Sequence, residues 1–362
     1  MKILIARTGR GDDGRAPMLC GLRGVGKTVL LNTLADQAER EDWFTVRVEA
    51  RATETFEYQL ARALRDAYRS VSWRHDLSDR VRSAFGTVQS FSLKADLTGS
   101  VSAGIDVDPQ RGRADSGNLE ADIYDLSLDL SEAAIDRKVG IALFIDELQE
   151  ASAMVLRALT HAVHRASQTQ RPFYVVGAGL PSLVGGLSEA SSYSERLFEY
   201  RQITQLTPGQ SAEVLQRPAR AEGVSWESAA IDLIVGETAG YPYFLQEFGR
   251  AAWDAAPGPD IITRSDALAA VNDARQALDH GFFRARWDRA TRAERSYLAA
   301  MSKDGSGPSS TADVANRLGK PPSAFGPARA NLINKGLIYS PEHGQIAYTV
   351  PGMADFIRRE IK

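Results

Sequence analysis

The sequence predicts an α/β protein, in which helices cover a parallel β-sheet, followed by a helical region and a C-terminal winged helix-turn-helix. Three observations predict this fold. Apolar runs alternate with amphipathic helical patterns through the first half of the chain. A glycine-rich turn joins the first apolar run to the first helical pattern. Residues 287–362 show three helical patterns, two strand patterns around a turn, and a closing helix.

The first 70 residues follow a strand–helix–strand–helix rhythm. "APMLCGL" ends in glycine and is typical of a buried strand, whereas "TVLLNTLADQAER" has the apolar spacing of a helix. "WFTVRVEA" alternates as a strand does, and residues 55–71 form a strongly amphipathic helical pattern. After residue 118 the rhythm returns, because "VGIALFIDELQ" and "PFYVVGAG" indicate buried strands beside helical patterns.

Residues 85–117 interrupt this rhythm. "VQSFSLKADLTGSVSAGIDVD" alternates apolar and polar residues around two glycines, and "PQRGRADSGN" is polar and rich in turn-forming residues. We therefore expect a β-hairpin or small insertion here, followed by a flexible loop.

The glycine-rich turn has the pattern of a phosphate-binding loop. "GLRGVGKT", residues 21–28, matches G-x-x-x-x-G-K-[ST] between a predicted strand and a predicted helix. Its glycines let successive backbone N–H groups face a phosphate, and the helix adds its positive end. Lys27 would reach the β- and γ-phosphates, and the Thr28 hydroxyl would bind Mg²⁺. The predicted triphosphate contacts are Gly21, Arg23, Gly24, Val25, Gly26, Lys27, Thr28 and Val29.

Two carboxylates follow the apolar run of "IALFIDELQE". Asp146 and Glu147 stand at the carboxyl end of the predicted strand, which is where ligands bind in open α/β sheets. Asp146 would hold Mg²⁺, directly or through water, and Glu147 would act as the general base on the attacking water. A nucleotide switch needs the aspartate, whereas a hydrolase also uses the glutamate.

Two later stretches carry further candidates. "SSYSERLFEYRQITQL" contains Arg196, which could stabilise the charge of the transition state as an arginine finger. The alternative is that Arg196 and Arg201 both pair with local glutamates. The strand ending at Gly179 has no polar side chain at its tip, and Ser182 is the nearest hydroxyl. In "GETAGYPYFLQEFGRAAW", Pro242 suits the first turn of a helix, and the aromatic residues around it would either stack on a purine base or pack in a core.

Five motifs together resemble the AAA+ branch that groups origin-recognition-like, archaeal-type and STAND-like ATPases: "GLRGVGKT", "FIDELQE", "VVGAGLP", "SYSERLFEY" and "GYPYFLQE". The resemblance covers most of the chain from Pro17 onward. It implies an ATP and Mg²⁺ site between a P-loop sheet core, residues 1–205, and a helical lid, residues 206–286. It also implies a winged helix behind them, residues 287–362.

The chain departs from that branch in two places. Such proteins usually carry a helix before the first strand, and the residues preceding Pro17 resemble only the end of that helix. A lid arginine is expected just after the glycine-proline turn, where this chain has Tyr243, and Arg250 lies further along the helix.

The C-terminal module is the predicted partner-binding part. As a DNA reader it would place its third helix in the major groove, using residues within 310–345. Residues 287–362 contain 11 Lys and Arg against 7 Asp and Glu, whereas the chain as a whole has a net charge of −3. A protein-binding winged helix is the alternative. The predicted base-edge contacts are Ser323, Arg329, Asn331 and Lys335, with Arg317 and Lys320 toward phosphates.

The composition agrees with a cytoplasmic protein. Cys20 is the only cysteine, so no internal disulfide can form, and no apolar run is long enough to span a membrane. We expect an ATPase that hydrolyses ATP slowly with Mg²⁺ and acts on DNA, on a partner protein or by nucleotide-dependent self-association. The alternatives are a nucleotide-gated switch with little turnover and a DNA-binding regulator whose shape ATP controls.

Overall fold

The computed structural model describes residues 1–361 except 52, 73–77, 96–104, 106 and 259. The chain divides into two compact units. Residues 1–21 and 27–202 form the first, here called the sheet unit, and residues 22–26 and 203–362 form the second, here called the lid unit. The predicted domain boundaries at residues 205 and 286 stay a prediction.

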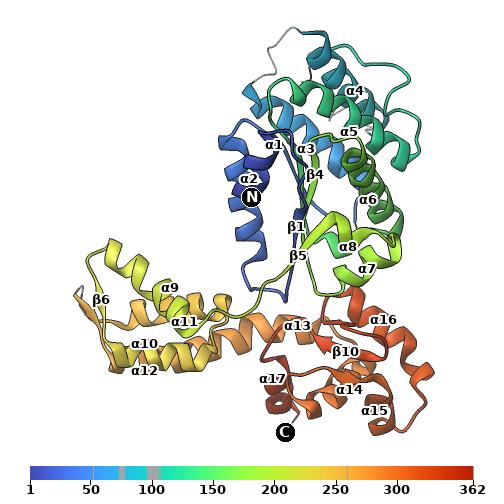
Figure 1. The fold of residues 1–362 in the computed structure, drawn as a ribbon. Helices are drawn as coiled ribbons and strands as arrows, with labels where there is room; N and C mark the ends of the chain where they lie inside the picture. Colours follow the sequence, from blue (N-terminus) through green and yellow to red (C-terminus); the bar gives the residue numbers. More distant parts are fainter. Residues whose placement is uncertain (52, 73–77, 96–104, 106, 259, 362) are drawn as a thin grey trace. The chain divides into compact units, whose positions relative to one another are not determined.

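The sheet unit is built on five parallel strands in the order β2-β3-β4-β1-β5. The apolar runs of β1, β3 and β4 are buried on both faces, as the sequence predicts for a parallel sheet covered by helices, whereas β5 at the edge is partly exposed. In Figure 1, α2 lies on one face of this sheet and α6 on the other. The strands are β1 (Ala16–Cys20), β2 (Phe44–Glu49), β3 (Ile141–Asp146), β4 (Phe173–Gly179) and β5 (Phe198–Gln202).

The helices of the sheet unit follow the predicted rhythm, with α1 before the first strand. Those between the strands are amphipathic, and their apolar faces are buried. The α-helices in the described part of this unit are α1 (Lys2–Thr8), α2 (Lys27–Arg40), α3 (Phe56–Ser70), α4 (Asp79–Ala95), α5 (Leu119–Ile135), α6 (Ala153–Gln168), α7 (Leu183–Ala190) and α8 (Ser194–Leu197).

The sheet order brings the carboxyl ends of β1, β3 and β4 together at one edge. Cys20 of β1 pairs with Gly179 of β4, and Ile145 of β3 pairs with Gly177 of β4. From β1 the chain crosses to the edge strand β2 and then returns through β3 and β4, so the connections that leave β1 and β4 run in opposite directions. That reversal is where open α/β sheets bind ligands.

The predicted β-hairpin at residues 85–117 is wrong over its first part, where α4 (Asp79–Ala95) continues to residue 95. Val81, Phe85, Val88 and Phe91 are buried at helical spacing against α3 and α5. The alternation that suggested a strand comes from serines, of which Ser92 donates to the Val88 carbonyl within the helix (2.8 Å). Residues 96–104 and 106 lie outside the described residues.

The loop that follows is anchored to α5 rather than free of it. Arg113 forms ion pairs with Asp125 (2.9 Å) and Asp129 (2.6 Å) of that helix. Asp122, which is buried, accepts hydrogen bonds from the backbone of Ser116 (3.0 Å) and Gly117 (3.0 Å). These bonds hold the described residues 113–117 against the helix, so the predicted flexible loop is wrong for this stretch.

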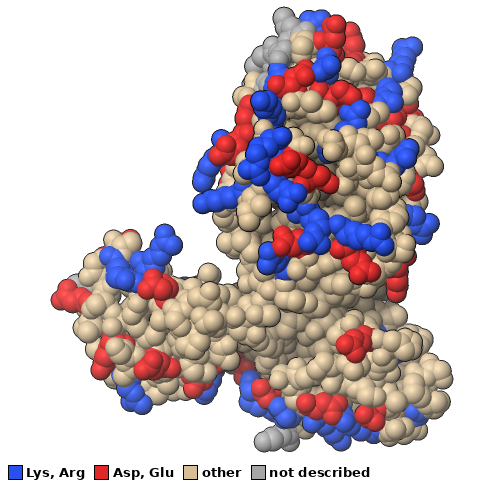
Figure 2. All heavy atoms as spheres, in the orientation of Figure 1, with Lys and Arg blue, Asp and Glu red and all other residues tan. Residues whose placement is uncertain are grey.

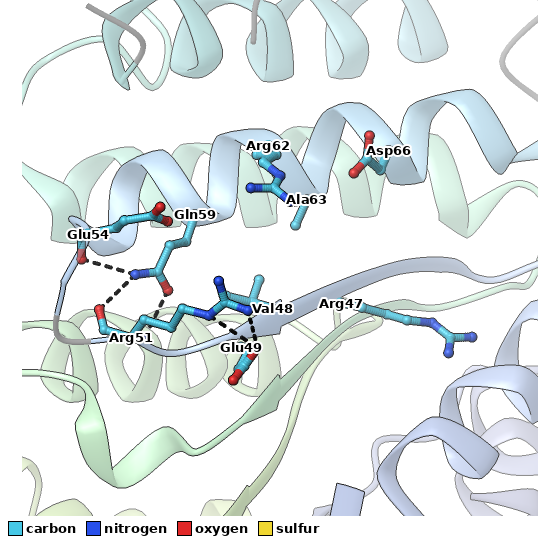
Figure 3. Close-up of a pocket in the computed structure, with 9 residues that line it drawn as sticks. All are labelled: Arg47, Val48, Glu49, Arg51, Glu54, Gln59, Arg62, Ala63 and Asp66. Atoms are coloured by element: carbon cyan, nitrogen blue, oxygen red, sulfur yellow. Dashed lines mark hydrogen bonds and ion pairs between the residues drawn. The ribbon is translucent and has the colours of Figure 1, made fainter. Parts of the chain in front are cut away.

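A polar hollow lies between β2 and α3 (Figure 3). Gln59 holds the loop beside it, because its amide donates to the carbonyls of Arg51 (2.9 Å) and Glu54 (3.0 Å) and accepts from the Arg51 backbone (3.2 Å). Arg51 pairs with Glu49 (2.5 Å), and Arg47 pairs with Asp36 (2.7 Å) outside the hollow. The charges on its walls are balanced, so this hollow has no strong preference for an anion or a cation.

The lid unit contains a helical bundle and a winged helix. The bundle comprises α9 (Pro208–Ala221), α10 (Ser228–Thr238), α11 (Pro242–Ala255) and α12 (Arg264–Ala277), with the short strands β6 (Ser225–Trp226) and β7 (Ile261–Ile262). A π-helical turn, η3 (Leu278–Phe283), continues α12 into α13 (Arg284–Asp288). Gly240 (φ +71°) separates α10 from α11, and a Cβ there would lie 2.3 Å from the Leu206 carbonyl oxygen.

The winged helix has the predicted order of elements. Three strands pair in the order β8-β10-β9, and the turn between β9 and β10 contains Gly344 (φ +77°). The third predicted helix begins as a 3-10 turn, η5 (Pro322–Phe325), and continues as α16. The remaining elements are α14 (Arg292–Met301), β8 (Ser309–Ser310), α15 (Thr311–Arg317), α16 (Gly326–Asn334), β9 (Ile338–Tyr339), β10 (Gln345–Tyr348) and α17 (Met353–Glu360).

Candidate active site

The glycine-rich loop connects β1 to α2, as the sequence predicts. Gly24 (φ +85°) and Gly26 (φ +93°) both have the left-handed backbone conformation that side chains disfavour. Gly21 donates its N–H to the carbonyl of Gly179 (3.1 Å), which fixes the start of the loop at the tip of β4. Such a curled, glycine-rich backbone before a helix is suited to bind an anion.

Lys27 is the first residue of α2 and is only 5% exposed. Its ammonium group acts on Cys20 at the end of β1: burial raises the pKa of the Cys20 thiol to about 11, and Lys27 partly opposes this rise. Cys20 therefore remains a neutral thiol near neutral pH and is no nucleophile. The lysine lies beside the carboxyl end of β1, where a phosphate-binding side chain is needed.

Thr28 and Asp146, the two predicted metal ligands, are in direct contact. The Thr28 hydroxyl donates to Asp146 Oδ2 (2.6 Å), although the two residues are 118 positions apart. One hydroxyl and one carboxylate fit Mg²⁺, which keeps several waters and takes further oxygens from phosphates. Among the described residues, no cluster of three or more His, Cys, Asp and Glu side chains forms a metal site. Thr28 and Asp146 are therefore the residues that could hold Mg²⁺ at this end of the sheet.

Glu147, the predicted base, follows immediately in a left-handed conformation (φ 49°). Its N–H donates to Asp146 Oδ1 (2.8 Å), and its Oε2 accepts from Gln149 Nε2 (2.6 Å). Gln149 lies in the 3-10 turn η2 (Leu148–Glu150), and its Oε1 accepts from the Leu180 N–H (2.8 Å). Sequence reasoning did not single out Gln149, because its contact with Leu180 spans 31 positions.

Comparison with known families shows what this part of the chain is similar to. Residues 2–176 match the family model described as AAA ATPase domain. This part of the chain is therefore similar to AAA ATPase domains. The match confirms the resemblance to AAA+ P-loop ATPases and agrees with the α/β fold described above. Residues 280–357 match a second model, described as a domain of unknown function (DUF8462), which covers most of the winged helix.

The solved structures that the chain matches include three for which the match covers almost the whole chain. The RuvB Holliday junction branch migration motor of Thermotoga maritima is 17% identical, with 95% of this chain and 88% of that chain covered (TM-score 0.46). The Aeropyrum pernix Orc1 protein in complex with DNA is 15% identical (99% and 90% covered, TM-score 0.45). Cdc6p from Pyrobaculum aerophilum is 16% identical (100% and 93%, TM-score 0.46). No curated protein matches the chain in sequence.

Arg196, the predicted arginine finger, lies on α8 beyond the family match and is exposed. Within the described part of the chain its side chain has no ion-pair partner, whereas Arg201 pairs with Glu199. The predicted alternative, pairing with a local glutamate, therefore holds for Arg201 and not for Arg196. Its role as a finger stays a prediction.

The middle of the loop, residues 22–26, belongs to the lid unit rather than to the sheet unit. Tyr243 of α11 donates its N–H to the carbonyl of Gly24 (3.2 Å), and Arg23 donates its N–H to the carbonyl of Thr349 (3.1 Å). Pro242 occupies the first turn of α11, as predicted. Val29 is 70% exposed on α2.

The predicted base-stacking aromatics pack with protein instead. Tyr241 is 2% exposed, and Tyr243 stacks on Phe282 at 4.7 Å between ring centroids. Phe244 contacts Phe282 and neighbouring rings edge to face. Arg250 is exposed and pairs with Glu247 (2.8 Å), so it makes a surface contact rather than a nucleotide contact. The core-packing alternative therefore holds for these aromatics.

Two of the predicted DNA contacts of the winged helix are structural. Lys335 Nζ binds Glu294 Oε2 (2.6 Å), and the Glu294 side chain is 3% exposed. Arg317 pairs with Asp304 and donates to the carbonyl of Ala300 (2.9 Å). Both cations therefore have intramolecular partners, and their contact with DNA stays a prediction.

The other predicted contacts of the winged helix are accessible. Ser323, Lys320 and Asn331 are exposed, and Arg329 is partly exposed without an ion-pair partner among the described residues. In the face shown by Figure 2, the surface around α14 and α15 is mostly uncharged, with basic and acidic side chains side by side along its margin. This face carries no uniform basic patch of the kind that DNA binding favours.

Replacing Lys335 with alanine should destabilise the winged helix. The buried Glu294 carboxylate would lose its cation, and breaking a buried ion pair on one side costs about 3 kcal/mol. Denaturant unfolding of the full chain measures this loss, and Lys320→Ala, at an exposed position, is the matched control. Unchanged stability together with lost DNA binding would return Lys335 to the role of a DNA contact.

Proposed function

We propose that this chain binds ATP with Mg²⁺ and hydrolyses it slowly. The observation that carries the proposal is the 2.6 Å contact between Thr28 of the glycine-rich loop and Asp146 of β3, with Glu147 next in the chain. Lys27, the loop amides and Thr28 would hold the polyphosphate, and Asp146 would complete the Mg²⁺ site. Glu147 would accept a proton from the attacking water.

The proposal is tested by measuring binding of ATP and release of phosphate by the purified chain, with Mg²⁺ and with EDTA. We expect binding of the triphosphate and a slow phosphate release that requires Mg²⁺. Failure to bind ATP would rule out the whole proposal. Binding of ATP without turnover would instead support a nucleotide-gated switch.

The switch is the second candidate, and a specific observation favours it. Residues 22–26 of the phosphate-binding loop are bonded to Tyr243 and Thr349 of the lid unit. A nucleotide that reshapes this loop would therefore alter contacts made by the lid and the winged helix. We propose that the output is binding of a partner by the winged helix, or self-association in which Arg196 reaches the nucleotide of a second copy.

For the partner of the winged helix, the ion pairs of Lys335 and Arg317 favour a protein over duplex DNA. Binding to duplex DNA at several salt concentrations distinguishes the two. A steep fall in affinity with salt would indicate phosphate contacts within residues 310–345, whereas absence of binding would favour a protein. None of the described helices is both long and apolar enough to cross a lipid bilayer, and we propose a cytoplasmic location.

A further inference from the structure

Gln149 connects the proposed base to the tip of the neighbouring strand. Its Nε2 donates to Glu147 Oε2 (2.6 Å) and approaches Glu150 Oε1 (3.4 Å). Its Oε1 accepts from the Leu180 N–H (2.8 Å), which directly follows β4. The Gln149 amide is therefore bonded at both of its polar atoms, through nitrogen to the Glu147 carboxylate and through oxygen to the backbone just after β4.

The tip of β4 is shaped to receive this amide. A Cβ at Gly179 would lie 2.6 Å from Gln149 Oε1 and 2.9 Å from Leu183 Cδ2, which is closer than real Cβ atoms approach. Gly179 has no positive φ, so its backbone conformation alone does not require glycine. A Cβ there would displace the far ends of the Gln149 and Leu183 side chains, so glycine leaves room for the Gln149 amide.

We propose that Gln149 is a positioning residue, which orients the Glu147 carboxylate toward the attacking water and ties it to β4. The proposal rests on the proposed ATP hydrolysis and on Glu147 as its base. Gln149 is neutral, so it orients the carboxylate without cancelling the negative charge that a general base needs. The hydrogen bond from Gln149 fixes Oε2 of Glu147. The backbone of Glu147 itself has an uncommon left-handed conformation.

The test is Gln149→Leu, which leaves an apolar side chain one atom shorter and removes both hydrogen bonds. We expect kcat for ATP hydrolysis to fall about 10- to 100-fold, as when an orienting partner of a reactive group is lost, while ATP affinity changes little. Gly179→Ala should reproduce these changes, because its Cβ displaces the Gln149 amide.

Gln168→Leu, on the exposed end of α6, is the matched control and should leave kcat and ATP affinity unchanged. A fall in melting temperature with unchanged kcat would overturn the inference, because it would make Gln149 merely a structural support. A lower kcat accompanied by equally weakened ATP binding would overturn it too. Absence of hydrolysis by the unmodified chain would instead contradict the proposed function.

Discussion

Replacing Lys27 with alanine is expected to weaken ATP binding by about 100-fold, because charge-assisted contacts to phosphate are among the strongest hydrogen bonds in proteins. This corresponds to about 2.7 kcal/mol of binding free energy. Lys27 begins α2 and lies beside the end of β1, so its ammonium group meets the same sheet edge as Thr28 and Asp146. Titration of the purified variant with a fluorescent ATP analogue measures the change.

The matched control for this experiment is Lys94→Ala, which removes an exposed lysine near the end of α4 in the same unit. It should bind ATP as the unmodified chain does. The melting temperature of each variant without nucleotide shows whether the fold is retained. Equal ATP affinity of Lys27→Ala and the control would mean that the loop does not hold the polyphosphate through this lysine.

The fold of the sheet unit could be predicted because its strands are continuous apolar runs. Such runs, followed by glycine or by carboxylates, mark buried strands with ligand-binding ends, so β1, β3 and β4 could be placed without tertiary information. The contact between Thr28 and Asp146 could be predicted for the same reason, because the carboxyl ends of the parallel strands in one sheet lie at the same edge.

The differences between prediction and structure have two physical origins. Helix α4 was missed because serines between its apolar residues gave a strand-like alternation, although Val81, Phe85, Val88 and Phe91 have helical spacing. The ion pair of Lys335 could not be predicted, because its partner Glu294 lies 41 positions away on α14. The same holds for the bond between Gln149 and Leu180, since spacing along the chain carries no signal for such distant partners.

Replacing Glu147 with glutamine is expected to lower kcat for ATP hydrolysis at least about 100-fold, while ATP binding is retained. The amide has nearly the shape of the carboxylate but cannot accept a proton from water. Its oxygen can still accept the hydrogen bond from Gln149, so the geometry between η2 and β4 should persist. Phosphate release in single-turnover and steady-state assays measures the loss of kcat. The control is Glu189→Gln, at an exposed position of α7.

This variant also separates the two candidate functions, because it should hold ATP without converting it. If hydrolysis resets the molecule, Glu147→Gln would accumulate in the ATP-bound form, and its self-association or partner binding would persist where that of the unmodified chain decays. If the chain is a switch with little turnover, both proteins would give the same time course after ATP addition. Unchanged phosphate release by Glu147→Gln would show that another group activates the water, and the contact of Gln149 with Glu147 would then serve structure alone.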